Sequence, residues 1–333
     1  MFKKYNSIEN TYRSLFLEKI KNHGFWKDEY VVQEKAHGAN LSYWTSDGIN
    51  FRTAKRSGNI EASEKFYNHE PVLEGIKDQF SNIWNGLKEQ YPDLSQMTIF
   101  GELIGGNYPH KDIAKDNHSS KIQKGIHYCP ENRFYAFDIL INAAQYLSVD
   151  EANHFFEKEG LLYAKTLFRG SIETCLEYPN EFDSTIPSLM QLPAIHPNIC
   201  EGVVIRPVET LFMKNGNRVI LKNKNEKWSE NLKFDKKIIK TEPLSDKVIK
   251  LVEAIATYAT ENRLENVISK YGDFDMKDTG KLIGLFNKDI LENFLKDYQH
   301  ITDELEKKDY KTITKSIGRS TAGMVRERIR SAL

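Results

Sequence analysis

One lysine stands where its amine could act as a nucleophile. In the stretch VVQEKAHGAN, residues 31–40, Lys35 ends an apolar run and is followed by His37 and Gly38. A lysine attacks an electrophile only in its neutral form, and a free lysine side chain has a pKa near 10.4. Lowering this pKa to about 7 requires roughly 4–5 kcal/mol of destabilisation of the ammonium form. Burial at a strand end, nearby cations (Arg56, Lys222 and Lys224) and a bound metal ion would all act in that direction. A solvated lysine at a strand end is the ordinary alternative.

Five further short segments carry polar residues at the ends of predicted strands. They are AKRSG (54–58), FGE (100–102), YAFD (135–138), EGVVIRP (201–207) and LKNKN (221–225). Lys222 and Lys224 alternate along one strand, so both side chains project from the same face. Two cations on one face are unfavourable without an anion, and a triphosphate is a natural one. A solvated strand face remains the alternative.

The elements that must position these groups are short strands up to about residue 235. Several segments alternate apolar and polar residues or are rich in β-branched and aromatic side chains. These patterns predict strands at 30–35, 40–44, 49–55, 97–103, 133–140, 201–208 and 217–224. A helical pattern occupies 70–91. Ser148 and Glu151 have the spacing of a capping box before a second helix at 148–160.

After about residue 240 the pattern becomes helical. Apolar residues spaced three and four apart fill 245–272, behind a Ser245 cap, and helical patterns follow at 278–298 and 320–333. We therefore predict an α+β domain over residues 1–240 and a smaller all-helical domain over residues 241–333. A length of 333 residues agrees with two domains of usual size.

The composition is that of an ordinary globular protein with enough apolar residues, 40%, for a real core. The N-terminus has no apolar signal region, and no uncharged apolar run is long enough to cross a membrane. Cys129, Cys175 and Cys200 have no zinc-site spacing, so we expect reduced thiols in the cytoplasm. The net charge is zero, yet residues 211–250 hold eleven Lys or Arg against five Asp or Glu. This basic band could bind phosphates or could be a solvated linker.

Taken together and in this order, the six segments resemble the covalent nucleotidyltransferase superfamily of polynucleotide ligases and mRNA capping enzymes. In that superfamily the nucleophile lies in Lys-x-Asp-Gly or a variant. The variant with histidine, present here as KAHG at 35–38, is similar to the RNA ligase 2 family. The similarity extends to MFKKY at the N-terminus and to RLENVISKYG, KLIGL and DILE near the C-terminus. It implies an ATP-grasp-like nucleotidyltransferase domain of antiparallel sheets with flanking helices, followed by a small all-α domain.

The resemblance also implies a nucleotide site. Lys35 would be the catalytic residue, attacking the α-phosphate of ATP, releasing pyrophosphate and leaving a lysyl-AMP. The residues that would bind the nucleotide are Glu34, Lys35, His37, Asn40, Lys55, Arg56, Glu102, Phe137, Glu201, Lys222 and Lys224. Gly38 would permit a tight turn and close approach of the backbone to the nucleotide.

Individual roles follow for the residues around the nucleophile. Glu34 would line the adenine pocket, while His37 and Asn40 would lie near the phosphates or the water of a bound metal. Each of these three could instead be structural. Arg56, more than Lys55, would contact phosphate or ribose, because a planar guanidinium suits phosphate oxygens. A basic pair before Ser-Gly is also common in surface turns.

The later segments would complete the site. Glu102 would accept a hydrogen bond from a ribose hydroxyl, and Phe137 would stack on the purine unless it only packs in the core. Glu201 would hold Mg²⁺ or Mn²⁺, since hard carboxylate oxygens suit such cations. Arg206 stands where the family has lysine and would contact RNA phosphate. In the helical tail, Arg263 and Lys270 would contact RNA.

The function that the resemblance implies is an ATP-dependent RNA ligase. It would join a 3′-OH to a 5′-phosphate through lysyl-AMP and RNA-adenylate intermediates, with nicked duplex RNA as its substrate. The alternatives are another covalent nucleotidyltransferase, namely a DNA ligase or a GTP-dependent capping enzyme, and a non-catalytic RNA-binding protein. We expect a monomer without a membrane partner, acting in the cytoplasm, which for a phage-encoded ligase would be that of the host.

Overall fold

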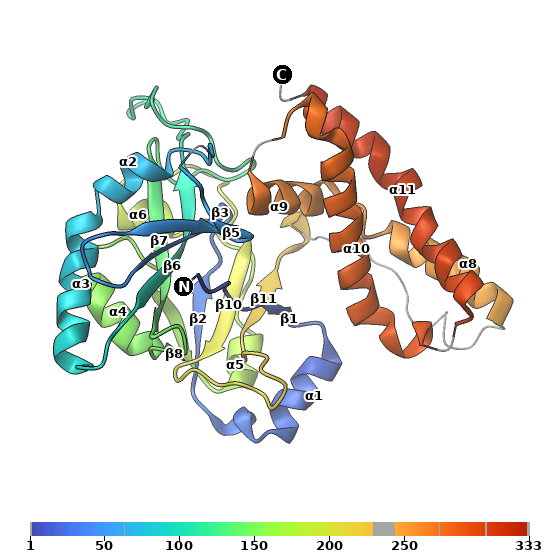
Figure 1. Ribbon diagram of the computed structural model, residues 1–333, viewed down its shortest axis with the longest axis horizontal. Helices are drawn as coiled ribbons and strands as arrows, with labels where there is room; N and C mark the ends of the chain where they lie inside the picture. Colours follow the sequence, from blue (N-terminus) through green and yellow to red (C-terminus); the bar gives the residue numbers. More distant parts are fainter. Residues whose placement is uncertain (1, 63, 229–243, 273, 304, 332–333) are drawn as a thin grey trace. The chain divides into compact units, whose positions relative to one another are not determined.

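The computed structural model describes residues 2–62, 64–228, 244–272, 274–303 and 305–331. The chain forms two compact units, Met1–Lys227 and Trp228–Leu333 (Figure 1). The domain boundary that the sequence predicts near residue 240 falls in 229–243, outside the described residues.

The first unit is built on two sheets. A five-stranded sheet has the order β1-β11-β10-β2-β9, and a six-stranded sheet has the order β5-β4-β3-β6-β7-β8. All neighbours are antiparallel except β1 and β11. The strands are β1 (Glu9–Asn10), β2 (Tyr30–Glu34), β3 (Ala39–Thr45), β4 (Arg52–Lys55), β5 (Gly58–Asn59), β6 (Met97–Gly105), β7 (Asn132–Ile141), β8 (Gln145–Tyr146), β9 (Thr166–Gly170), β10 (Gly202–Pro207) and β11 (Leu221–Lys224). The seven predicted strands are confirmed, with shifted ends.

Helices cover the outer faces of both sheets. They are α1 (Ser14–Asn22), α2 (His69–Glu74), α3 (Lys77–Gln90), α4 (Val149–Lys158), α5 (Ile172–Leu176) and α6 (Ile186–Leu189), with short 3₁₀ turns at Phe25–Lys27 and Glu226–Trp228. The capping box of Ser148 and Glu151 at the start of α4 is confirmed. The single helix predicted over 70–91 is instead two helices, α2 and α3, which are separated at Gly75 and Ile76.

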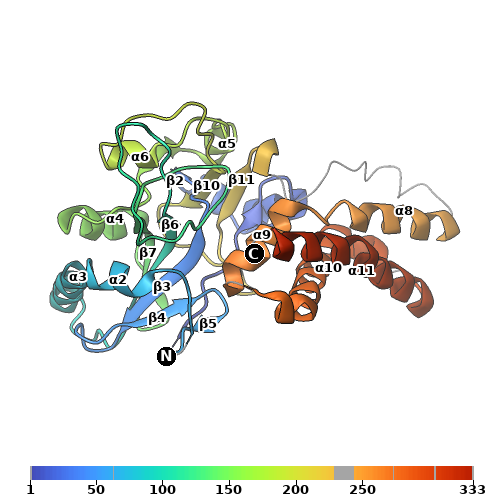
Figure 2. The ribbon, with the colours of Figure 1, turned by 90° about the horizontal axis from the view of Figure 1, so that it is seen from above.

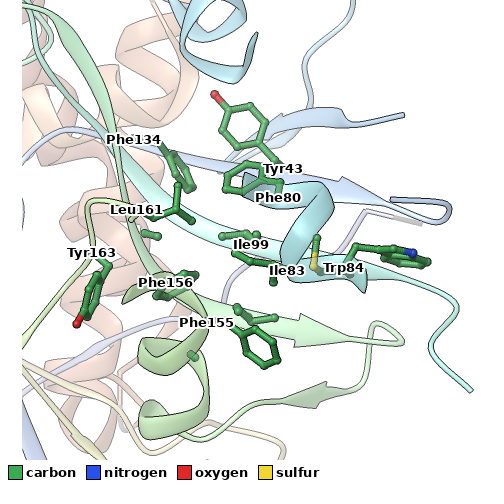
Figure 3. Packing of buried hydrophobic residues seen from close by; sticks show 14 of the residues in the cluster. Tyr43, Phe80, Ile83, Trp84, Ile99, Phe134, Phe155, Phe156, Leu161 and Tyr163 are labelled. Carbon is green, nitrogen blue, oxygen red and sulfur yellow. The ribbon is translucent and has the colours of Figure 1, made fainter. Parts of the chain in front are cut away.

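Each sheet buries its outer face in its own core. Helices α3 and α4 pack Phe80, Ile83 and Phe156 on the six-stranded sheet, where they meet Ile99 and Phe134 (Figure 3). Helices α1 and α5 pack on the outer face of the five-stranded sheet in the same way. A third cluster joins residues from the inner faces of the two sheets. The groups that could do chemistry lie on these inner faces.

The second unit is helical. It comprises α8 (Leu244–Ala256), α9 (Glu261–Tyr271), α10 (Thr279–Thr302) and α11 (Lys307–Arg330), with a 3₁₀ turn at Met276–Asp278. The predicted Ser245 cap is wrong, because Ser245 lies inside α8. Helices α10 and α11 run side by side in both views (Figures 1 and 2), and all four helices contribute to one core.

Two further expectations concern the state of the cysteines and helices that could cross a membrane. Cys129, Cys175 and Cys200 are all buried free thiols. Among the helices of the described ranges, none has both the length and the apolar character required to cross a bilayer.

Candidate active site

Lys35 lies where the chain passes from one sheet to the other. Strand β2 belongs to the five-stranded sheet and β3 to the six-stranded sheet, so KAHG (35–38) joins two sheets and is not the turn of a hairpin. The backbone N–H of Lys35 donates to the carbonyl of Gly202, 2.9 Å away, and continues the pairing of β2 with β10. The Nζ of Lys35 donates to Oε2 of Glu201 at 2.7 Å.

Gly38 is the last residue of the segment that joins the two sheets. Packing leaves no space for a side chain at this position. A Cβ built on Gly38 would lie 2.2 Å from the carbonyl oxygen of Leu103 in β6. The neighbour that excludes a side chain is therefore a strand of the protein. A close approach of the backbone at Gly38 to a nucleotide remains a prediction.

Glu201 is the centre of the charged cluster. Its carboxylate is 2% exposed and binds two ammonium groups, Lys35 at Oε2 and Lys224 at Oε1, the latter at 2.6 Å. His37 Nδ1 lies 3.5 Å from Oε2. Burial by itself would raise the pKa of Glu201, but the charges of Lys224 and Lys35 and the hydrogen bond from His37 hold that pKa well below its ordinary value. Glu201 is consequently ionised.

Strand register explains why these groups converge. Strand β10 lies between β2 and β11, with Gly202 opposite Lys224 and Val204 opposite Lys222. Because side chains alternate, Lys222 and Lys224 share the face of Ile220, which packs between the sheets. Gly202 has a φ of +134°, and a Cβ there would lie 2.1 Å from the carbonyl oxygen of Asn223. Only glycine fits beside Glu201.

The six-stranded sheet contributes a second carboxylate and an amide. Asn40 in β3 and Glu102 in β6 are directly opposite each other. Desolvation of Glu102 and the negative charge of Glu201 raise the pKa of Glu102 to about 7, against the opposing charge of Lys35 and hydrogen bonds from Gly38 and Asn40. Glu102 is therefore divided between its protonated and ionised forms near neutral pH.

The side chain of Glu34 lies away from the Glu201 cluster, where Ser184 and Thr185 bind it. Its carboxylate is buried and accepts hydrogen bonds from Ser184 Oγ at 2.5 Å and from the N–H and Oγ1 of Thr185, each at 2.7 Å. Burial raises the pKa of Glu34, although these hydrogen bonds oppose the shift. This carboxylate ties β2 to the segment that begins α6. An adenine contact by Glu34 remains a prediction.

Phe137 is the extra residue of a β-bulge. Phe100 pairs with Asp138 and Gly101 pairs with Ala136, so Phe137 has no partner in β6. Such bulges redirect side chains. The ring of Phe137 lies 5.0 Å from that of Tyr5, within the cluster between the sheets. Phe137 thus packs against Tyr5 in this cluster, and stacking of Phe137 on a purine remains a prediction.

The segment AKRSG lies at the edge of the six-stranded sheet. Lys55 donates to Glu64 and its Nζ lies 5.7 Å from the ring centroid of Phe66. Arg56 is half-buried in the turn between β4 and β5, and its charge opposes the rise in the pKa of Tyr146 that burial causes. Arg56 is therefore within electrostatic reach of the space between the sheets.

Arg206 was predicted to contact RNA phosphate, and the structure places it in the interior. It is 2% exposed and donates to both carboxylate oxygens of Asp138, at 2.9 and 3.2 Å. Arg218 of the basic band is also buried and donates to Asp138 at 2.6 Å. Burial would raise the pKa of Asp138, but these two guanidinium groups lower it. Both arginines therefore neutralise a buried carboxylate.

Of the two RNA contacts predicted in the tail, Arg263 also lies in the interior, whereas an RNA contact by Lys270 remains a prediction. Arg263 is 1% exposed, donates to Asp289 at 3.0 Å, and lies over the ring of Tyr258. Lys270 donates to the same carboxylate at 2.7 Å and is partly exposed. Arg263 is thus part of the core of the helical unit, and its prediction as an RNA contact is corrected on this ground.

Two residues of the site were missed from the sequence. Tyr128 accepts a hydrogen bond from the backbone N–H of His37 at 2.8 Å, and it is fully buried. It lies in the connection between β6 and β7, where no periodic pattern distinguishes it. Asp138 stands at the end of YAFD, and its role in the interior could have been suspected from a carboxylate within an apolar strand.

A divalent cation fits this site only together with phosphate. Within residues 2–331, leaving out those the structure does not describe, no group of three His, Cys, Asp or Glu side chains is arranged to hold a metal ion. Protein-bound Mg²⁺ often uses one or two carboxylates plus substrate phosphates and water. Glu201 and Glu102 match this requirement, because the charge of Glu201 acts on Glu102.

The sequence of this chain is similar to those of known RNA ligases. The sequence model of the RNA ligase family matches residues 28–224, and that of the T4 RNA ligase 2 C-terminal region matches residues 222–322. Mitochondrial RNA-editing ligase 2 of Trypanosoma brucei brucei is 28% identical, with 89% of this chain and 84% of the relative covered. Mitochondrial RNA-editing ligase 1 of the same organism is 27% identical over 84% of this chain and 73% of the relative.

Solved structures of an RNA ligase from Naegleria gruberi are more distant. A variant with ATP and Mn is 16% identical with a TM-score of 0.43, and the match covers 68% of this chain and 57% of that chain. The same ligase with PPi also has a TM-score of 0.43. The family assignment depends on the sequence matches, of which the first spans more than half of the 333 residues. The chain belongs to the RNA ligase family, in its RNA ligase 2 branch.

Proposed function

We propose that this protein is an ATP-dependent RNA ligase that joins a 3′-OH to a 5′-phosphate in three nucleotidyl transfers, with Lys35 as nucleophile. The observation that carries the proposal is the convergence of Lys35, Glu201 and Lys224 on the inner face of a sheet, in a domain of the RNA ligase family. The curated relatives are themselves named RNA-editing ligases.

In the first transfer, Lys35 attacks the α-phosphorus of ATP. Lys35 leaves its ion pair with Glu201, and its ammonium loses one proton before the attack and one after it. The N–P bond forms, the bond from the α-phosphorus to the bridging oxygen breaks, and pyrophosphate departs. Lys222 and Lys224, on the same sheet face, would offset the negative charge of the triphosphate. Mg²⁺ or Mn²⁺ bound with the nucleotide beside Glu201 would supply further positive charge at the phosphates.

The remaining transfers use RNA. An oxygen of the RNA 5′-phosphate attacks the phosphorus of lysyl-AMP, the N–P bond breaks, and the lysine amine regains its protons. The 3′-OH then attacks the 5′-phosphorus of the adenylated end, and AMP departs. Glu102, whose pKa is about 7, could accept a hydrogen bond from the ribose of the nucleotide during these steps.

The finer parts of the proposal concern substrate and organisation. We propose that nicked duplex RNA is the preferred substrate, that residues 1–240 carry adenylation, and that the helical residues 241–333 engage RNA. We also propose that the protein acts as a monomer in the cytoplasm. The match of the tail to the T4 RNA ligase 2 C-terminal region supports the division of the chain.

Label transfer from α-labelled ATP with Mg²⁺ tests the first step. The intact chain should acquire label, and Lys35→Ala should acquire none. Lys165→Ala is the matched control, because Lys165 is a half-exposed lysine of the same unit that pairs with Glu157. Mass spectrometry that finds AMP on another lysine would contradict the assignment.

Sealing assays separate the alternatives. Incubation with α-labelled GTP in place of ATP would identify a capping-type enzyme, and sealing of nicked DNA but not of nicked RNA would identify a DNA ligase. Comparison of nicked duplex RNA with single strands tests the substrate preference. A chain that binds RNA but never acquires label would be a binding protein only.

A further inference from the structure

Helix α11 carries a row of exposed cations on one side. Lys311, Lys315, Arg326 and Arg330 are all exposed, and we refer to these four as the α11 cation row. The spacings are four, eleven and four residues, and eleven residues are close to three turns of 3.6. The row therefore follows one face of the helix over about 28 Å, at about 1.5 Å per residue.

The side of α11 that faces the core adjoins the row. Ile313, Ile317, Val325 and Ile329 are buried in the core of the helical unit. Helix α11 packs against both α10 and α8. Because the four cations are exposed while these apolar residues are buried, the cation row is directed to solvent.

The row is electrostatically unfavourable as it stands. It contains two pairs of like charges at i and i+4, Lys311 with Lys315 and Arg326 with Arg330, and such pairs destabilise a helix. In the described part of the chain, no carboxylate lies within ion-pair distance of any member of the row. Nearby Lys308 differs, because it pairs with Glu306 at 3.0 Å.

Helix α11 as a whole also has an excess of positive charge. Over 307–330 there are eight Lys or Arg and two acids, Asp309 and Glu327. A solvated helix face usually mixes both signs of charge. A one-sign row of this length instead matches a polyanion with regularly spaced charge.

We propose that the α11 cation row binds the sugar–phosphate backbone of duplex RNA without reading its sequence. Double-stranded DNA presents about one negative charge per 1.7 Å of its axis, and an RNA duplex likewise has one phosphate per nucleotide, so a rigid row of about 28 Å can meet several phosphates at once. The arginine forks add bidentate geometry at one end of the row. The inference deepens the proposed RNA ligase function and moves the contact of the tail from Arg263 on α9 to α11.

The test measures the salt dependence of RNA binding by the full chain. The row variant combines Lys311→Gln, Lys315→Gln, Arg326→Gln and Arg330→Gln, since glutamine retains helix propensity. The control variant changes four exposed lysines of the same unit to glutamine and alters the net charge equally; these are Lys277, Lys281, Lys288 and Lys296. The probe is a short nicked RNA duplex with a 3′-deoxy end, which cannot be sealed.

The expected result is a change of slope. Each phosphate contact contributes about 0.9 to the magnitude of the slope of log Kobs against log salt. The slope of the row variant should therefore be smaller in magnitude than that of the wild-type chain by about 3 to 4. The control variant should lose less than about 1. If the row variant melts early by circular dichroism, Lys315→Gln alone replaces it, with an expected loss of about 1. Its control is then Lys288→Gln alone, which should leave the slope unchanged.

Equal slopes for the row and control variants would overturn the inference, as would an intact chain that does not bind the duplex. Label transfer from ATP to the intact chain is measured in parallel. Its failure would contradict the proposed ligase function, whereas the slopes decide the role of the α11 cation row independently.

Discussion

The protonation of Glu102 offers a quantitative test of how the interior of the site is organised. Burial and the neighbouring charge of Glu201 raise the pKa of Glu102 from 4.5 to about 7 in the folded protein. Between these two pH values the folded state keeps a proton that the unfolded state has lost. The free energy of unfolding therefore falls as pH rises through this window.

The size of the effect follows from the shift. Each pKa unit corresponds to about 1.4 kcal/mol, so the Glu102 contribution amounts to about 3 kcal/mol. It is fully present below pH 4.5 and is lost by the time the pH passes 7. Glu102→Gln cannot ionise. The stability of the variant relative to the wild-type chain should therefore rise by about 3 kcal/mol between about pH 4.5 and about pH 8.

Urea denaturation at a series of pH values measures this difference. Tryptophan fluorescence reports mainly on the first unit, because three of the four tryptophans, Trp26, Trp44 and Trp84, lie there. Glu157→Gln serves as the control, since the Glu157 side chain is 70% exposed. A stability difference for Glu102→Gln that stays constant over this range would refute the argument that burial keeps Glu102 protonated.

Three further predictions concern single residues. Asp138→Asn should destabilise the first unit by about 3–5 kcal/mol in urea denaturation, because it leaves two buried guanidinium groups without a carboxylate; a loss below about 1 kcal/mol would count against this. Gly38→Ala should lower stability by about 1–3 kcal/mol through the clash with β6, while Gly58→Ala, which meets open space, should change it little. Arg263→Met should lower the melting temperature of the helical unit and leave the salt dependence of RNA binding unchanged; the reverse pattern would restore Arg263 as an RNA contact.

Local sequence patterns predicted most of the elements. The seven strands are either alternating in apolar and polar residues or rich in β-branched and aromatic side chains, and both patterns favour a strand. The Ser148–Glu151 pair marks the start of α4 because a capping box needs residues only three apart. The helix over 70–91 was predicted too long, since apolar spacing alone does not register the break at Gly75 and Ile76. Helices α1, α5 and α6 are too short for apolar spacing to predict them.

The sequence by itself also predicted the segments of the candidate site, because their order resembles that of the motifs of a known family. It did not determine which charges are available to a ligand. Lys224, Arg206 and Arg263 are all cations in the sequence, yet only the tertiary structure sets their partners. Lys224 meets Glu201 between the sheets, whereas the two arginines are buried against carboxylates distant in sequence. A charge takes its role from its burial and its neighbours, and both depend on contacts that strand pairing and helix packing make between distant parts of the chain.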